Sequence, residues 1–182
     1  MIRLLDEPWM PLVTAGTAPR RVTLPGLLAR LGGLEEFALP RVRPHQAPAL
    51  HAFLVQLASL ALESGGGEMP QDEVAWRNLL RQLTMQWPDD EPWQLIVDDV
   101  GQPAFLQPPA GTGEREPFPK TIDAPDALDV LVTSRNHDLK QQRMHIGADV
   151  SDWVLALINL QTFGGFGGKR NYGVVRMNGG FA

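Results

Sequence analysis

Pro-Ala-Leu-His-Ala-Phe-Leu-Val-Gln-Leu-Ala-Ser-Leu-Ala-Leu-Glu, residues 48–63, predicts the central helix of the fold. Its apolar side chains follow the helical period at Leu50, Phe53, Leu54, Leu57 and Ala61. Val55, Leu60 and Leu62 are expected to widen this apolar surface, and three glycines at 65–67 end the helix. About 14 mostly apolar residues are too few to span a membrane, so we expect a buried core helix and no membrane partner.

Upstream of this helix, the chain predicts a small antiparallel sheet and a short helix. Residues 20–23 read as a strand that returns to pair with residues 10–13. Thr23 is placed to cap a helix that carries a proline in its first turn and ends at two glycines. Its inner face is expected to hold Leu27, Leu28 and Leu31.

Downstream, two more helices and a hairpin are expected. Residues 72–83 place apolar side chains on one helical face, and residues 93–107 read as a hairpin-like return in which Asp98 and Asp99 form the turn. Asp149 is placed to cap a helix that runs to about residue 162. The fold class predicted is therefore α+β: a loop-rich mixed domain in which short antiparallel strands pack with several helices.

Positive charge gathers at the end of an otherwise acidic chain. The protein has 182 residues and a net charge of −5, which suits one domain. Residues 1–132 carry a balance of −8, whereas residues 133–182 carry +3. An acidic body with a basic edge is typical of a localised polyanion contact.

Two polar segments carry this charge and flank the last predicted helix. The first, residues 133–147, includes Lys140 and Arg143. The second begins Phe-Gly-Gly-Phe-Gly-Gly-Lys-Arg at residue 163, and its glycines allow the backbone to approach another surface closely. Successive backbone N–H groups in such a loop can bind an anion, and Lys169 and Arg170 add positive potential.

The residue types needed for catalysis do not form a recognisable site. Ser134, His137 and Asp138 suit acyl transfer, but they lie in one loop without a nucleophile-elbow pattern. Lys169 is followed by Arg170 instead of Ser or Thr, which excludes a Walker phosphate loop. The chain has no cysteine, which excludes disulfides and thiolate nucleophiles and fits a cytoplasmic location. We expect no enzyme and no cofactor.

In order along the chain, several motifs resemble the CasA family, the large subunit of type I-E CRISPR Cascade complexes. They are Leu-Leu-Asp-Glu-Pro-Trp-Met-Pro at 4–11, the leucine-rich helix after residue 48, Phe-Leu-Gln at 105–107, Asn-His at 136–137 and Gly-Phe-Gly-Gly at 165–168. The resemblance covers nearly the whole chain. It implies a DNA-binding subunit that recognises the protospacer-adjacent motif (PAM) of invading double-stranded DNA and helps start its unwinding.

By this resemblance, the glycine loop enters the minor groove at the PAM, where glycines let backbone N–H groups reach base edges. The second loop, around Asn136, corresponds to the loop that contacts the motif and the 5′ handle of the guide RNA. Other implied partners are the remaining Cascade subunits and a helicase-nuclease recruited after target binding. The nucleic-acid-binding residues predicted are Gly165, Phe166, Gly167, Gly168, Lys169, Arg170, Asn136, Lys140 and Arg143.

Members of this family are much longer than 182 residues, so residues 1–182 are expected to be a single N-terminal domain of a longer chain. Two other functions remain open at this point. One is a structural subunit that contacts protein or RNA without reading the PAM, and the other is a metabolic enzyme with an anion site.

Overall fold

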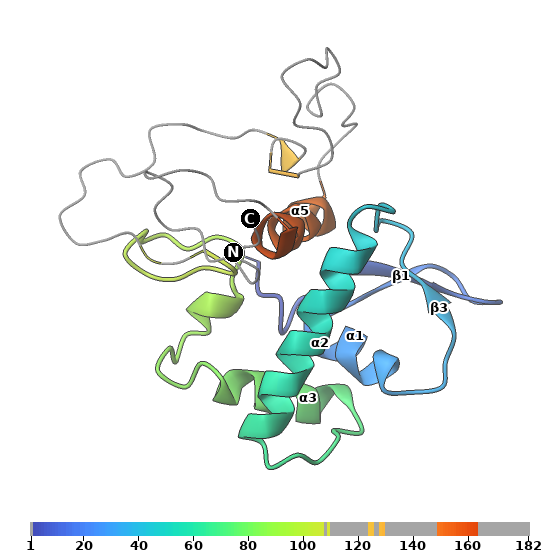
Figure 1. Cartoon of the computed structure of the whole chain (residues 1–182), viewed down its shortest axis with the longest axis horizontal. Coiled ribbons are helices and arrows are strands. Elements are labelled where there is room, and N and C mark those ends of the chain that lie inside the picture. The colour runs from blue at the N-terminus through green and yellow to red at the C-terminus, as the bar shows by residue number, and fades with distance from the viewer. Residues whose placement is uncertain (1, 108, 110–123, 126–127, 130–148, 164–182) are drawn as a thin grey trace.

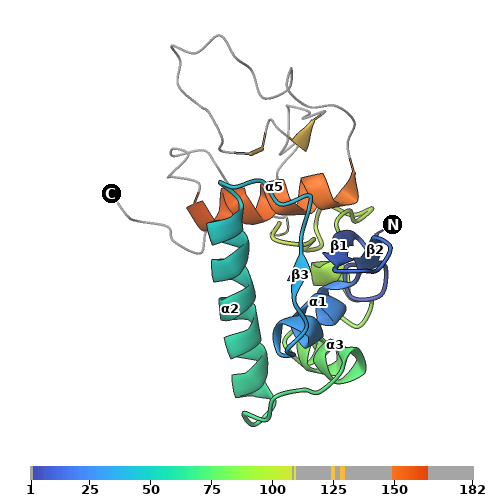
Figure 2. The ribbon, with the colours of Figure 1, turned by 90° about the vertical axis from the view of Figure 1, so that its right-hand side faces the viewer.

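The computed structural model describes residues 2–107, 109, 124–125, 128–129 and 149–163. Within these residues lie a three-stranded antiparallel sheet and four α-helices, so the predicted α+β class is confirmed. Helix α2 forms the long axis of the body in Figure 2, and α5 crosses one end of it. Helices α1 and α3 lie together toward the other end, beside the sheet (Figures 1 and 2).

The sheet has β1 (Met10–Thr14) at its centre, between β2 (Arg20–Val22) and β3 (Phe37–Ala38). Met10 pairs with Val22 and Leu12 with Arg20, as expected for the predicted return of the chain. Met10 and Leu12 are both fully buried, because alternate residues of a strand share one face. This face of the sheet joins the core.

Helix α1 (Leu24–Leu31) begins where the sequence predicts, at Thr23. The Thr23 hydroxyl accepts a hydrogen bond from the Gly26 N–H at 3.0 Å and donates to Glu73 Oε1 at 2.8 Å. Glu73 is the first residue of α3 (Glu73–Gln82). The side chain of Thr23 therefore both caps α1 and connects it to α3. Trp76 and Leu80 of α3 are buried, as the apolar pattern predicts.

Helix α2 (Ala47–Ser64) is longer than the sequence predicts, and its core-facing side chains are the expected ones. All five predicted positions are buried: Leu50, Phe53, Leu54, Leu57 and Ala61. One other expectation is wrong, since Leu31 of α1, expected on the inner face, is half exposed. Val55 and Leu60 of α2 are also at least half exposed, so they widen the apolar surface of that helix on its open side. Neither helix is covered on all sides by the described residues, so each keeps apolar side chains on its open side.

Residues 93–107 differ from the predicted hairpin. A short 3₁₀ turn, η1 (Glu91–Trp93), leads into backbone that bonds to the N-terminal residues, with the Leu95 N–H donating to the Ile2 carbonyl at 3.0 Å. The Phe105 N–H donates to the Gln94 carbonyl at 2.7 Å. A hairpin would instead join these two stretches by a series of backbone hydrogen bonds. Asp99 accepts from the Gly101 N–H at 2.8 Å, which supports the turn role predicted for it.

Candidate nucleic-acid interface

The predicted contact residues lie outside the described part of the chain, in segments 130–148 and 164–182. They are Asn136, Lys140, Arg143, Gly165, Phe166, Gly167, Gly168, Lys169 and Arg170. The structure describes the helix that joins the two segments, α5 (Val150–Phe163), and the residue on the near side of the first segment, Asp129.

Helix α5 is buried along most of its length. Its apolar positions Val154, Leu155, Ala156, Leu157 and Ile158 are at most 8% exposed, and Ser151, Asn159, Gln161 and Thr162 are buried as well. In Figure 2 the helix lies across the N-terminal end of α2. A helix with apolar and buried polar residues around much of its circumference is a core element. It therefore gives both flanking segments a fixed starting point.

Asp149, directly before α5, holds this end of the helix to the sheet. Its carboxylate accepts from the Ser151 N–H at 3.1 Å, so Asp149 caps the helix as predicted. The Asp149 N–H in turn donates to Asp152 Oδ2 at 2.9 Å, which completes a reciprocal cap. Arg21 of β2 binds Asp149 through two nitrogens, with Nη1 at 2.9 Å from Oδ1. Hydrogen bonding from Arg21 holds the pKa of the Asp149 carboxyl well below its usual range, against the opposing effect of burial.

Asp149→Asn should reveal this ion pair through the pH dependence of unfolding. Asparagine keeps the capping oxygen, so the variant mainly removes the charge. Because the folded pKa is lowered, the stabilisation is complete above the unfolded pKa of about 4 and is lost as the pH falls toward the folded value. Urea unfolding should show the variant less stable by up to ~1 kcal/mol near neutral pH. A gap of the same size at about pH 3 would contradict this origin.

The other end of α5 is tied to residues 104–107. Gln161 Nε2 donates to the Leu106 carbonyl at 2.8 Å, and Leu106 has a φ of 55°, in the left-handed region. A side-chain hydrogen bond therefore connects the last turns of α5 to residues 104–107.

Sequence reasoning missed a buried carboxylate, Asp129, before the first segment. Its side chain is 1% exposed. It accepts from Asn159 Nδ2 at 2.6 Å and Gln46 Nε2 at 2.8 Å, and His45 Nε2 lies 2.9 Å from both of its oxygens. Arg43 Nη1 is 3.5 Å away. The sequence does carry one sign of this site, since Asp129 lies inside the apolar run 127–132. If such a run is buried, its carboxylate needs hydrogen-bond or ion-pair partners.

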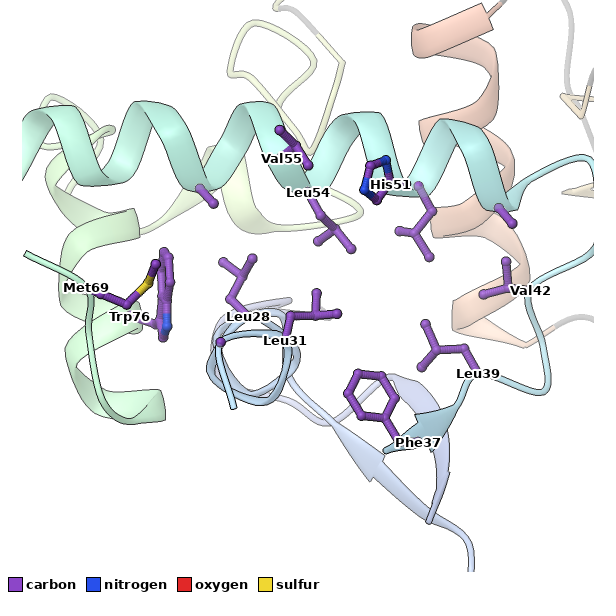
Figure 3. A pocket seen from close by; sticks show the side chains of 14 residues that line it. Leu28, Leu31, Phe37, Leu39, Val42, His51, Leu54, Val55, Met69 and Trp76 are labelled. Atoms are coloured by element: carbon purple, nitrogen blue, oxygen red, sulfur yellow. The ribbon is translucent and has the colours of Figure 1, made fainter. Parts of the chain in front are cut away.

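An apolar groove lies on another side of the body, between α1, α2 and β3 (Figure 3). Its volume is about 650 Å³. Leu31, Leu54 and Phe37 point toward the same space from three elements (Figure 3). His51 is the one titratable side chain among the lining residues, and it has no acidic neighbour there. The groove has the chemistry to hold apolar groups and lacks an acid–base pair.

Two further tests concern metals and membranes. Across the described ranges, no group of three or more histidine or acidic side chains is arranged to hold a metal ion. Helix α2 is long and apolar enough to cross a membrane by length and composition alone. About a third of this span is buried, and its buried residues pack one face of the helix against the rest of the body: Ala49, Leu50, Phe53, Leu54, Leu57 and Ala61.

Comparison with known proteins shows which family the chain belongs to. The family model described as CRISPR-associated protein Cse1 matches residues 4–181. No curated protein and no solved structure matches the chain. The match spans both the described scaffold and the two segments with the predicted contact residues. The chain therefore belongs to the Cse1 (CasA) family, the large subunit of the type I-E CRISPR Cascade complex.

Proposed function

We propose that this protein recognises the PAM of invading double-stranded DNA for Cascade. The glycine loop at 165–168 enters the minor groove, and the subunit helps start unwinding beside it. The protein acts by binding instead of catalysis, and base pairing to the guide RNA supplies most of the sequence specificity. The observation that carries the proposal is the family match over residues 4–181, which includes both basic segments.

The geometry of α5 supports contact with one nucleic acid by both segments. The helix has 14 residues, so its ends are about 21 Å apart. That length corresponds to roughly six base pairs of a duplex. Segments that start at the two ends can therefore reach neighbouring parts of one target, with the loop at 165–168 at the PAM and Asn136 nearer the guide RNA handle.

The charge arrangement supports the same proposal. Among residues 133–182 the acids are Asp138, Asp149 and Asp152. Asp149 is paired with Arg21, and Arg41 lies 3.6 Å from Asp149 and 3.5 Å from Asp152. Because the body neutralises the two acids of this helix, they offset little of the positive charge that the segments carry.

Within the assembly, each partner has a proposed place. The 5′ handle of the guide RNA and the PAM are contacted through the two segments, and other Cascade subunits hold the protein on the complex. A helicase-nuclease is recruited after the target is bound. All of this takes place in the cytoplasm.

Replacing Lys169 and Arg170 together with alanine should weaken DNA binding about equally for matched and mismatched motifs, because cations that contact phosphates carry no sequence information. The slope of log affinity against log salt should become shallower by up to about 1.8, since each lost phosphate contact contributes about 0.9. The measurement is duplex binding by assembled Cascade at several salt concentrations, with motifs chosen from a randomised library. Loss of discrimination with unchanged overall affinity would refute this assignment.

A structural subunit without PAM reading is the second candidate, and the apolar groove favours it. Leu31, Val55 and Met69 are about half exposed at its edge, a feature of surfaces that pack against protein. The same binding experiment separates the two functions. Equal affinity of wild-type Cascade for every motif in the library would favour the structural role and remove the PAM proposal.

A further inference from the structure

Arginine side chains lie over buried carboxylates at the N-terminal end of α5, beside β2 (Figure 2). The two acids at this end of the helix, Asp149 and Asp152, are only 17% and 11% exposed on their side chains. Arg21 of β2 pairs with Asp149, and Arg41, which follows β3, pairs with both acids. Each arginine side chain is 44% exposed, so guanidinium groups form the outer layer and carboxylates the inner one.

The same layering continues at Arg43, whose Cα lies within about 7 Å of that of Arg41 because the two are two residues apart. Arg43 Nη1 is 3.5 Å from Asp129, and the exposed fractions of the two side chains are 31% and 1%. We call Arg21, Arg41 and Arg43 the arginine surface. Its formal charges are balanced by three acids, but a ligand outside it would lie nearer to the guanidinium groups than to the carboxylates. Since Coulomb energy falls with distance, the surface favours an anion.

The ion pairs on α3 lack this layering. Arg81 is 40% exposed and pairs with Asp6, which is 36% exposed. Arg77 is less exposed than both of its acids, Asp6 and Glu73. These pairs present both charges to solvent. An outer layer of arginine is therefore a property of the surface near α5 and does not follow from ion pairing alone.

Arg41 is the member of the arginine surface best placed to bind a ligand. Its nearest acidic oxygens are 3.6 and 3.5 Å away, and across the described residues these are ion pairs without a hydrogen bond. Arg21, in contrast, donates to Asp149 and to the Trp9 carbonyl. A guanidinium carries five N–H donors in a planar fork that matches the oxygens of a phosphate.

We propose that the arginine surface contacts the phosphates of a nucleic acid, with Arg41 making the direct contact. The choice of nucleic acid as the polyanion rests on the proposed function and on the family match that supports it. The target duplex and the guide RNA offer the same phosphate chemistry, so the experiment below separates these two sources.

Salt-dependent binding of the chain to two fluorescent probes, a short DNA duplex and a single-stranded RNA, tests the surface. Their sequences are arbitrary, because phosphate contacts carry no sequence information. Arg41→Gln should lower affinity about twofold to fivefold at low salt, the effect of one exposed ion pair. The slope of log affinity against log salt should become shallower by about 0.9 for the duplex or about 0.7 for the RNA.

The probe with the larger loss identifies the source of the phosphate. Unchanged affinity and slope on both probes would overturn the proposal, and so would the absence of any binding by the wild-type chain at low salt.

Asp152→Asn should have the opposite effect. Asparagine keeps an oxygen that can accept from the Asp149 N–H, and it removes a negative charge beneath Arg41. Affinity for the probe that Arg41→Gln affects should rise about twofold, the contribution of one unit charge at several ångströms in water. If the arginine only stabilises the fold, breaking its ion pair from the acidic side cannot strengthen binding. Equal or weaker binding by this variant would therefore refute the phosphate contact.

Arg81→Gln is the matched control, since Arg81 is similarly exposed but donates three hydrogen bonds to Asp6 and Asp90. It should lower the melting temperature more than Arg41→Gln does, yet leave probe affinity and salt slope unchanged. Loss of affinity in proportion to the loss of melting temperature would instead make both effects structural and the arginine surface wrong.

The probes lack a motif, so this test is separate from PAM reading. If the arginine surface fails and assembled Cascade still discriminates between motifs, the proposed function stands. If Arg41→Gln changes the salt slope and assembled Cascade binds every motif equally, the arginine surface stands and the PAM proposal is wrong.

Discussion

Replacing Gly168 with aspartate should lower PAM-dependent binding of assembled Cascade by roughly 10- to 100-fold, the range of one to two base-edge contacts. A side chain at this position would collide with base edges or push the loop away from the groove. The added carboxylate would also face phosphates across a minor groove about 6 Å wide. The measurement is duplex binding with and without the preferred motif. Assembly and thermal melting should be nearly unchanged, because the effect is on contact and not on folding.

Gly168→Ala is the control for this prediction. Its methyl group is smaller and uncharged, so binding should fall less than with aspartate. If the position requires a positive φ, alanine would also lower the melting temperature, which separates a folding role from a groove contact. Target binding by the aspartate variant at the wild-type level would remove this loop from the recognition site.

Ile158→Ala should destabilise the protein by about 2–5 kcal/mol, a large part of a typical stability of 5–15 kcal/mol. Ile158 lies on α5 and is 1% exposed, so truncation leaves a cavity in the core that α5 shares with α2. Chemical denaturation measures the loss directly. The loop-bearing helix would then be less firmly held, so target binding should weaken even at temperatures where the variant remains folded.

Leu60→Ala on α2 provides the matched control. Leu60 is 56% exposed, and its truncation should change stability by no more than about 0.5 kcal/mol. A similar loss in the two variants would mean that burial on α5 does not carry the stability assigned to it.

Local features of the fold could be predicted from the sequence. Thr23 and Asp149 were found as helix caps because a capping oxygen acts on N–H groups only two or three residues away. The core face of α2 could be predicted because the helical period of its apolar residues is visible within one short stretch of sequence. Leu31 was misplaced for the complementary reason, since periodicity identifies an apolar residue without saying whether another element covers it.

Contacts between distant residues could not be predicted. Asp129 and His45 are 84 positions apart, and Arg21 and Asp149 are 128 apart. No local spacing rule connects such pairs, so only the folded arrangement of β2, residues 41–46 and α5 brings them together. The predicted nucleic-acid contacts themselves, from Asn136 to Arg170, stay predictions, because they lie outside the described residues.

Photo-crosslinking tests PAM recognition by this subunit most directly. A target duplex with a photoreactive group in the minor groove of the PAM would be bound to assembled Cascade, irradiated, digested with trypsin and analysed by mass spectrometry. The glycine loop lies in the tryptic peptide 144–169, which ends at Lys169. We expect the crosslink in that peptide, within residues 165–168, and its loss when the preferred motif is changed. A PAM crosslink found only in other peptides or other subunits would contradict the proposed function.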